Sequence, residues 1–302
     1  RPGIEALFEV AGKDHRLATA SDLGFIVGPR LNAAGRLDDM SVGIECLLAD
    51  STASARAKAE NLRALNRERR DIEQSMQTDA VAQLDALNLD QADLPFAMTL
   101  YDQNWHQGVI GILASRIRER VYRPTLIFAD SDEGMLKASG RSIPGLHLRD
   151  ALDQVAARHP GLLTKFGGHA MAAGLTLAKA DFGPFCEAIN TVVADALDHV
   201  PPEPVAMSDG SLAPSDLTVP FAEQLEAGGP WGQHFAEPVF DNTFAVRRHR
   251  IVGEKHLKLT LESGGIEVDA IAFNIDVDEW SAAPLTQLGA LYRLDINDYR
   301  GT

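Results

Sequence analysis

The sequence predicts a mixed α/β protein in which a long helix leads into an α/β domain and then into a small C-terminal β-barrel. Residues 51–87 contain neither glycine nor proline, and their apolar side chains recur every three or four positions. Strand-like and helix-like segments alternate over 93–200, which is typical of an α/β unit. Beyond the proline-rich segment 201–204, short alternating strands separated by glycine turns favour a barrel.

The first 50 residues are too short to bury much apolar surface by themselves. Helical patterns cover 4–10 and 41–48, and the glycine-punctuated segment Gly28–Arg36 between them is predicted to be a loop. Glycine and alanine let an anion approach the backbone, and Arg30 and Arg36 offer donors suited to phosphate. Alternatively, these arginines only pair with the two aspartates that follow. Composition leaves both interpretations open.

The stretch 51–87 predicts one amphipathic helix about 50 Å long, at 1.5 Å per residue. Its single apolar stripe needs partners on one side only, as in a helix that joins two domains. Arg63, Arg67 and Arg70 share one face of this helix. They either contact phosphates or form a solvated face.

Residues 93–200 predict an α/β domain of four strands and three helices. The strands are expected at 96–101, 124–129, 135–139 and 172–177. The helices are expected at 108–121, 148–158 and 182–197. The alternation therefore places one α/β unit between the long helix and the proline linker.

Gly167, Gly168 and His169 form a motif that we predict to be a loop feeding the last of these strands. Paired glycines permit positive φ angles and add no side chain, so the histidine can face a backbone-lined pocket. A histidine there can donate to a phosphate oxygen or act as an acid or base. A lone histidine is more often structural, but the flanking glycines favour a function.

Two weaker signals lie in the same domain. Ser139 and Arg141 close a strand, where an arginine beside hydroxyl groups suits a phosphate clamp. His106 lies where a helix opens, and a helix N-terminus favours anions. A solvated arginine and a helix cap explain these two features equally well.

The predicted barrel carries a local basic segment. Its strands are expected at 240–246, 250–252, 257–261, 267–273 and 288–296. Five basic residues lie within 18 positions, against Asp241 and Glu254: Arg247, Arg248, Arg250, Lys255 and Lys258. Some small β-barrels bind single strands through a basic groove with aromatic rings on which bases stack. Phenylalanines 240, 244 and 273 are candidates for the rings, although phenylalanines on strands more often belong to the core.

Composition excludes several classes of protein. With 45% hydrophobic residues among 302, the chain can form two or three globular cores, and no apolar run is long enough to cross a bilayer. Two distant cysteines favour a reducing compartment, with the cytoplasm as the default. No P-loop, zincin, serine-hydrolase or zinc-finger spacing occurs. A net charge of −15 counts against a nucleic-acid partner, but a single-strand site needs only a local basic groove.

Four motifs in this order and separation resemble those of the RecJ family of single-strand-specific DNA exonucleases, in the DHH phosphoesterase superfamily. They are Gly28–Arg36, Trp105–Gly111, Ser139–Gly145 and Phe166–Gly174. The resemblance covers essentially the whole chain. It implies the end of a DHH catalytic domain at 1–50, a connector helix at 51–92, a DHH-associated domain at 93–200 and a truncated OB-fold at 201–302.

The resemblance also implies an activity. Members of this family use two Mn²⁺ or Mg²⁺ ions to hydrolyse phosphodiester bonds from a 5′ end, in DNA repair and recombination. The Asp-His-His triplet that names the superfamily does not occur here, and the resemblance places the metal ligands outside this chain. Because the chain starts at Arg1 rather than Met, we expect a piece of a longer protein that binds substrate and is inactive alone.

Residue roles follow from the resemblance alone. Asn32 and Arg36 are expected to support the scissile phosphate from the catalytic-domain side, while Ser139, Arg141 and His169 hold phosphate from the opposite side. Arg141 is expected to recognise the 5′ end, and His169 to stabilise charge in the transition state. Single-stranded DNA is the expected partner, with a helicase and a single-strand-binding protein as further expected partners and no membrane.

Two other functions stay open. A DHH-family phosphodiesterase that acts on short oligonucleotides or cyclic dinucleotides carries the same Gly-Gly-His element, but generally lacks the barrel. The chain as it stands also fits a non-catalytic single-strand-binding module. Cleavage of 5′-phosphorylated single-stranded DNA with added Mn²⁺ separates these alternatives.

Overall fold

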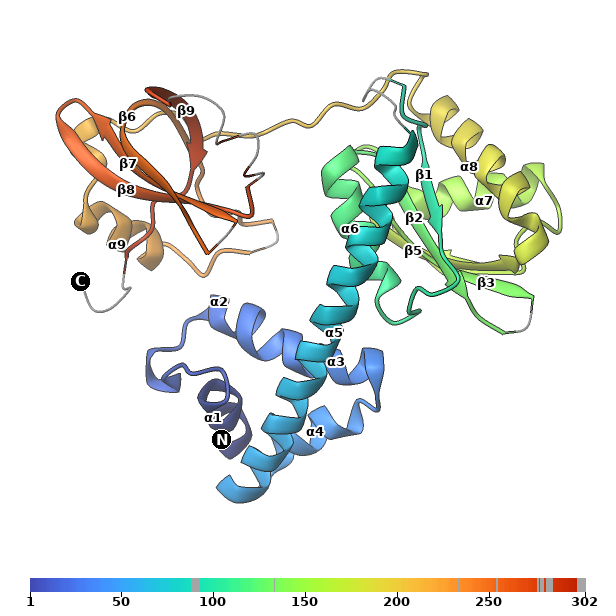
Figure 1. Cartoon of the computed structure of the whole chain (residues 1–302), viewed down its shortest axis with the longest axis horizontal. Coiled ribbons are helices and arrows are strands. Elements are labelled where there is room, and N and C mark those ends of the chain that lie inside the picture. Colours follow the sequence, from blue (N-terminus) through green and yellow to red (C-terminus); the bar gives the residue numbers. More distant parts are fainter. Residues whose placement is uncertain are drawn as a thin grey trace. The chain divides into compact units, whose positions relative to one another are not determined.

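The computed structural model describes residues 1–87, 93–132, 134–232, 234–253, 255–275, 277, 280 and 285–297. These form two compact units, Arg1–Pro204 and Val205–Thr302, each with its own hydrophobic core (Figure 1). The predicted mixed α/β fold class is confirmed. In the described part of the chain, no helix is long and apolar enough to span a membrane.

N-terminal helices pack against the first half of the long helix α5 (Thr52–Leu87) and leave one of its faces exposed (Figure 1). The helices that contact α5 are α1 (Pro2–Glu9), α3 (Gly28–Leu37) and α4 (Ser41–Leu48), and the single-turn α2 (Ala20–Asp22) lies in the segment between α1 and α3. Leu7, Phe8 and Leu62 are buried in the cluster that joins α1 to α5. Helix α5 thus supplies the apolar face that the short N-terminal segment needs.

The prediction that Gly28–Arg36 is a loop is wrong, because these residues form most of α3. Pro29 fits the first turn of a helix, where its missing N–H costs no hydrogen bond. Ala33 and Ala34 are fully buried, and their small side chains allow close packing against neighbouring helices. Burial therefore overrides the low helix propensity of the two glycines.

The α/β domain is a five-stranded sheet in the order β1-β2-β3-β5-β4. Only β1 (Met98–Tyr101) and β2 (Thr125–Asp130) pair in parallel among the described strands. The antiparallel part consists of β3 (Met135–Arg141), β4 (Lys165–Gly168) and β5 (Ala172–Ala178). The prediction that Gly167 and Gly168 lie in a loop is wrong: both pair with β5 in the short edge strand β4, which has no apolar alternation to reveal it.

Helices cover the two faces of this sheet unequally. Helices α7 (Leu148–Arg158) and α8 (Phe182–Ala196) pack on one face around Leu152 and Phe185. Helix α6 (Ile110–Val121) packs over β2 and β3 on the other face, and α5 lies against α6 through Met76. Beyond β3 this second face is open to solvent, as the exposed Gly174 shows.

The second unit contains an antiparallel sheet in the order β8-β7-β6-β9. Its strands are β6 (Phe240–Val252), β7 (His256–Ser263), β8 (Ile266–Phe273) and β9 (Gln287–Tyr292), and helix α9 (Val219–Ala227), which was not predicted, precedes them. The two strands predicted at 240–246 and 250–252 are one strand, with an irregularity between Val246 and Arg248. No pairing that closes the sheet into a barrel is present among the described strands.

Candidate nucleic-acid interface

Arg36, at the end of α3, contacts the loop that opens α6. Its Nη1 donates a hydrogen bond to the carbonyl oxygen of Gly108 at 2.9 Å. A Cβ atom at position 108 would lie 2.2 Å from the carbonyl oxygen of Arg36, so only glycine fits there. The N-terminal helices and the α/β domain therefore meet backbone to backbone at this point.

Arg141 and Ser139 extend from β3 toward the first turn of α6. Nη1 of Arg141 donates to the Ser139 Oγ at 3.1 Å and to the Gly140 carbonyl at 2.8 Å. A Cβ atom at Gly111 would lie 2.9 Å from the Ser139 Oγ and 3.0 Å from Nη2 of Arg141. The glycine thus leaves the space that these two side chains occupy.

Arg36, Ser139 and Arg141 form what we call the arginine cluster, and its charge is not neutralised. Burial lowers the pKa of Arg141, and repulsion from Arg36 and then Arg118 lowers it further. Burial likewise lowers the pKa of Arg36, with repulsion from Arg69 adding to it and Glu73 opposing it. Arginine nevertheless stays protonated. Among the described residues, no carboxylate pairs with Arg36 or Arg141, so an anion would be the missing partner.

One row of the sheet beside this cluster has almost no side chains. Gly174 of β5 pairs with Ser139 on one side and with Gly167 of β4 on the other. Residues opposite one another in neighbouring strands face the same side, so the two glycines continue the surface that Ser139 begins. A Cβ atom added at Gly167 would meet nothing within 4 Å. A ligand can therefore lie directly on the backbone here.

Two exposed histidines lie near residues of the arginine cluster or their strand partners: His106 near Gly108, which accepts from Arg36, and His169 near Ala172. His169 follows Gly168, and its backbone N–H donates to the Ala172 carbonyl at 2.8 Å; Ala172 in turn pairs with Arg141. Nδ1 of His106 accepts a hydrogen bond from the Gly108 N–H at 3.0 Å. The neutral His106 ring consequently carries its proton on Nε2, which can donate to an anion.

Two residues of α3 point in different directions. Asn32 is exposed and lies one helical turn before Arg36, so both share a face. Arg30 lies six positions before Arg36 on a different face, and its Nη1 donates to the Ile26 carbonyl at 2.7 Å. The sequence predicted that Arg30, like Arg36, binds phosphate. Helix α3 instead directs Arg30 away from the arginine cluster.

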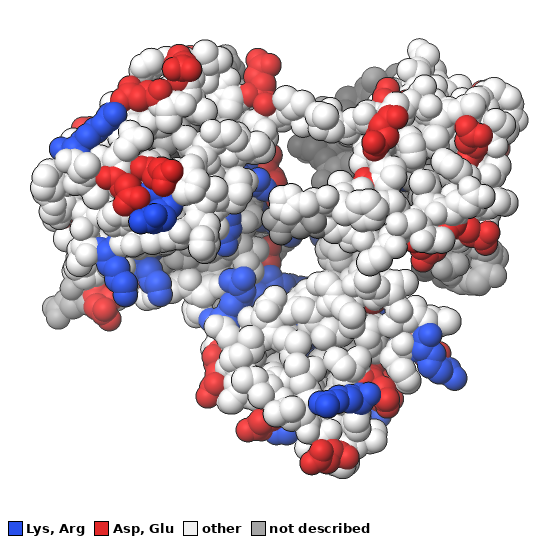
Figure 2. Space-filling model, turned by 180° about the vertical axis from the view of Figure 1, so that it is seen from behind, with Lys and Arg blue, Asp and Glu red and all other residues white. Residues whose placement is uncertain are grey.

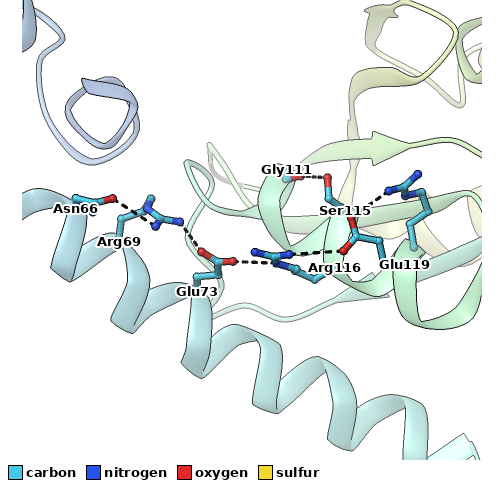
Figure 3. A network of polar contacts seen from close by, with 8 residues as sticks. Asn66, Arg69, Glu73, Gly111, Ser115, Arg116 and Glu119 are labelled. Carbon is cyan, nitrogen blue, oxygen red and sulfur yellow. Dashed lines mark hydrogen bonds and ion pairs between the residues drawn. The ribbon is translucent and has the colours of Figure 1, made fainter. Parts of the chain in front are cut away.

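A polar network that the sequence did not suggest joins α5 to α6 (Figure 3). Glu73 of α5 accepts from Arg69 with one carboxylate oxygen and from Arg116 of α6 with the other, at 3.3 Å. Arg116 also pairs with Glu119 at 3.6 Å. Because Glu73 and Arg69 are largely buried, this network fixes the connector helix against α6, next to Arg36.

The charge distribution of the first unit also indicates a basic region near the arginine cluster. Figure 2 shows Lys and Arg side chains gathered where the N-terminal helices meet the α/β domain, whereas basic and acidic side chains are mixed over the outer parts of the unit. The net charge of −15 is therefore an average that conceals a basic region.

A second basic surface lies on the outer face of the sheet in the second unit. Cross-strand pairing aligns Arg250 with Lys258 and Ile271, and aligns His256 with Phe273. The His256 and Phe273 rings meet edge to face at 5.3 Å, and Phe273 is 65% exposed. Basic and aromatic side chains thus share one face, which suits a single strand.

The other predicted basic residues lie around this face. Arg248 lies in the row of Thr260 and Asp269, Arg247 pairs with Glu262 at 3.2 Å, and Lys255 is exposed in the turn before β7. Lys258 is paired with Asp269 at 2.9 Å. Glu254, one of the two acidic residues in this basic segment, lies outside the described residues.

Phe240 and Phe244 do not present rings to a ligand, because they are buried in the core of the second unit at 7% and 2% exposure. Sequence reasoning missed another aromatic pair: Trp231 and Phe235, with ring centroids 4.8 Å apart. Phe235 is more than half exposed. The sequence feature that could have indicated this pair is an aromatic residue, Trp231, between Gly229 and Gly232.

The described residues do not provide a metal centre. No group of three or more His, Cys, Asp or Glu side chains in the described ranges is placed to hold a metal ion. The arginine cluster is cationic and does not suit a metal ion.

Fold and site together define a DHH-associated domain followed by an OB domain. Residues 93–195 match the DHHA1 domain, and residues 208–302 match the RecJ OB domain. The single-stranded-DNA-specific exonuclease RecJ of Dickeya dadantii (strain 3937) is 50% identical over all of this chain and 53% of its own length. RecJ of Escherichia coli (strain K12) is 49% identical over all of this chain and 52% of its own length.

A solved structure agrees with these sequence matches. The crystal structure of RecJ in complex with Mn²⁺ from Thermus thermophilus superposes with a TM-score of 0.78 at 29% identity, over all of this chain and 42% of that one. The chain belongs to the RecJ family, which confirms the resemblance seen in the sequence. It spans about half the length of the curated relatives that it matches.

Proposed function

We propose that this chain is the part of a single-stranded-DNA-specific 5′-3′ exonuclease that binds the substrate. The observation that carries the proposal is the arginine cluster: Arg36 and Arg141 converge without a carboxylate partner in the described structure, beside a bare sheet surface. Relatives that match the whole chain are named single-stranded-DNA-specific exonucleases.

In this proposal the cluster binds the phosphates at the 5′ end of the strand. Arg141 holds the terminal phosphate with Ser139, Arg36 and Asn32 approach the next phosphate from α3, and His106 and His169 donate from either side. His169 is assigned a further role in stabilising transition-state charge. The glycines at 167 and 174 let the strand lie against the backbone.

The outer sheet face of the second unit binds the strand by a different chemistry. Arg248, Arg250 and Lys255 attract phosphates, and Phe273 offers a face for a base to stack on. Arg247 and Lys258 are assigned smaller roles, because Glu262 and Asp269 already pair with them. Both units are therefore proposed to bind single-stranded DNA.

The whole protein is proposed to hydrolyse phosphodiester bonds with Mn²⁺ or Mg²⁺, since its structural relatives from Thermus thermophilus are described in complex with these ions. The described residues hold no ligand set for the metal, so this chain alone is proposed to bind without cleaving. Both cysteines are free, which fits a reducing compartment such as the cytoplasm. A helicase and a single-strand-binding protein stay expected partners, and no described residue assigns a surface to either.

Fluorescence anisotropy with a 5′-phosphorylated, 3′-labelled oligo(dT) tests this proposal. We expect the chain to bind the single strand at low salt, to bind a duplex more weakly and to release no nucleotides when Mn²⁺ is added. The protein at the length of its relatives should release nucleotides from the 5′ end with Mn²⁺. Absence of single-strand binding at low salt would contradict the proposal.

A further inference from the structure

We propose that the connector helix carries a second phosphate-binding surface for single-stranded DNA, separate from the arginine cluster. It consists of Arg63, Arg67 and Arg70 of α5, which we call the connector stripe, with Arg30 of α3 beside it. The inference rests on the proposed function, because its ligand is the same strand further from the 5′ end.

The geometry of α5 aligns the three arginines of the connector stripe. Their spacing of four and three residues keeps them within about 60° of one another around the helix. All three are exposed. The neighbouring Leu62 and Asn66 are buried on the side of α5 against which the N-terminal helices pack. The stripe rises about 10.5 Å along the axis, and a stacked strand carries a phosphate every ~3.4 Å, so it matches roughly three phosphates.

The charges of the connector stripe are poorly compensated within the protein. Arg63 pairs with Glu60 at 2.8 Å, but both side chains are largely exposed, so the pair is weak. Within the described part of the chain, neither Arg67 nor Arg70 has a carboxylate at ion-pair distance, and this includes Asp71, one turn after Arg67.

Arg30 adds a fourth positive charge from α3. Its Nε is buried without a hydrogen-bond partner in the described structure. Burial lowers its pKa, and repulsion from Arg70 and then Arg63 lowers it further, so these side chains lie close enough to repel one another. Like charges held together at a half-buried position are stabilised by an anion between them.

The position of the connector stripe relative to the arginine cluster favours a nucleic-acid strand over an isolated anion. Helix α3 packs along α5 and carries Arg30 toward one end and Arg36 toward the other, about 9 Å further along its axis. Arg36 lies near Arg69 and Glu73, whereas Arg30 lies near Arg63 and Arg70. The two anion sites therefore lie along the same helix pair, at a separation that a short stretch of one strand can span.

The salt dependence of binding tests this inference directly. The affinity of the 302-residue chain is measured against NaCl concentration for a 5′-phosphorylated 20-mer of dT and for a 5′-phosphorylated dinucleotide. The logarithm of the binding constant falls linearly with the logarithm of the salt concentration, and each phosphate contact on a single strand adds about 0.7 to the magnitude of this slope. We expect the variant R63Q/R67Q/R70Q to lose about 2 from the slope with the 20-mer and nothing with the dinucleotide.

Three further variants act as controls. R63K/R67K/R70K should keep the slope, because it keeps the charge. R16Q/R149Q/R158Q removes the same charge from exposed arginines that are paired with Asp14, Asp153 and Asp195, and should also keep it. If the triple Gln variant does not fold, R70Q alone should lose about 0.7.

The outcomes separate the two proposals. A wild-type slope in R63Q/R67Q/R70Q, or an equal loss in R16Q/R149Q/R158Q, would overturn the connector stripe and leave the arginine cluster intact. Failure of the wild-type chain to bind either oligonucleotide would overturn the proposed function itself.

Discussion

Arg36 donates a hydrogen bond to the carbonyl oxygen of Gly108, a residue 72 positions further along the chain, at 2.9 Å. This contact places a cation from the N-terminal helices beside the first turn of α6, where Gly111 leaves room for Ser139 and Arg141. Two segments far apart in the sequence thereby form the proposed binding site.

Replacing Gly111 by alanine tests how closely this site is packed. The added methyl group would lie 2.9 Å from the Ser139 Oγ and 3.0 Å from the guanidinium of Arg141, so both side chains must move. We expect at least a tenfold loss of affinity for 5′-phosphorylated oligo(dT) with the fold retained. Gly183→Ala is the matched control, because a Cβ atom there meets nothing within 4 Å, and it should bind like the wild type.

Gly167 and Gly168 are adjacent but should respond differently to alanine. At Gly168 φ is +146°, and a Cβ atom would lie 2.4 Å from the Ala172 carbonyl, so Gly168→Ala should lower the melting temperature. Gly167 has open space, so Gly167→Ala should keep the wild-type melting temperature and weaken DNA binding where the strand contacts the backbone. Equal melting temperatures for the two variants would contradict this assignment.

Glu73→Gln should destabilise the first unit. The change removes the charge that Arg69 and Arg116 share, and it leaves Arg69 buried without its carboxylate. We expect a loss of about 3 kcal/mol in the free energy of unfolding, measured with urea. Glu119→Gln is the comparison, because its exposed pair with Arg116 should contribute under about 1 kcal/mol.

The phenylalanines of the second unit divide into two kinds. Phe244→Ala should cost about 3 to 5 kcal/mol of stability, because the ring is 2% exposed and meets Tyr292 edge to face. Phe273→Ala should leave stability nearly unchanged and weaken binding of oligo(dT) by about 1 to 3 kcal/mol if a base stacks there. Urea unfolding and anisotropy on the same samples measure both effects.

Sequence periodicity predicted the elements that have a continuous apolar pattern. The helices at 41–48 and 148–158 and the long connector helix agree with the structure to within one residue. It failed at α3 and β4, where glycines suggested loops. In both, long-range packing or pairing decides the conformation: Ala33 and Ala34 are buried, and Gly167 pairs with Gly174.

The candidate site could be predicted only in part for the same reason. Motifs identified Arg36, Ser139, Arg141 and His169 as residue types that suit phosphate, but not which of them share a surface. The Arg36 contact with Gly108 and the Glu73 network depend on how α3, α5 and α6 pack. The outward position of Phe273 and the inward position of Phe244 follow from register, which is set by strand pairing.

The affinity of the chain and of its Arg141→Gln variant for oligo(dT) with a 5′-phosphate or a 5′-hydroxyl tests the central claim most directly. A charge-assisted contact to phosphate is worth about 1.5 to 3 kcal/mol. We therefore predict that the wild-type chain binds the 5′-phosphorylated strand about 10-fold to 100-fold more tightly than the 5′-hydroxyl strand, and that Arg141→Gln abolishes this difference with the melting temperature unchanged. A variant that keeps the full preference for the 5′-phosphate would contradict the arginine cluster as the binding site for the 5′ end.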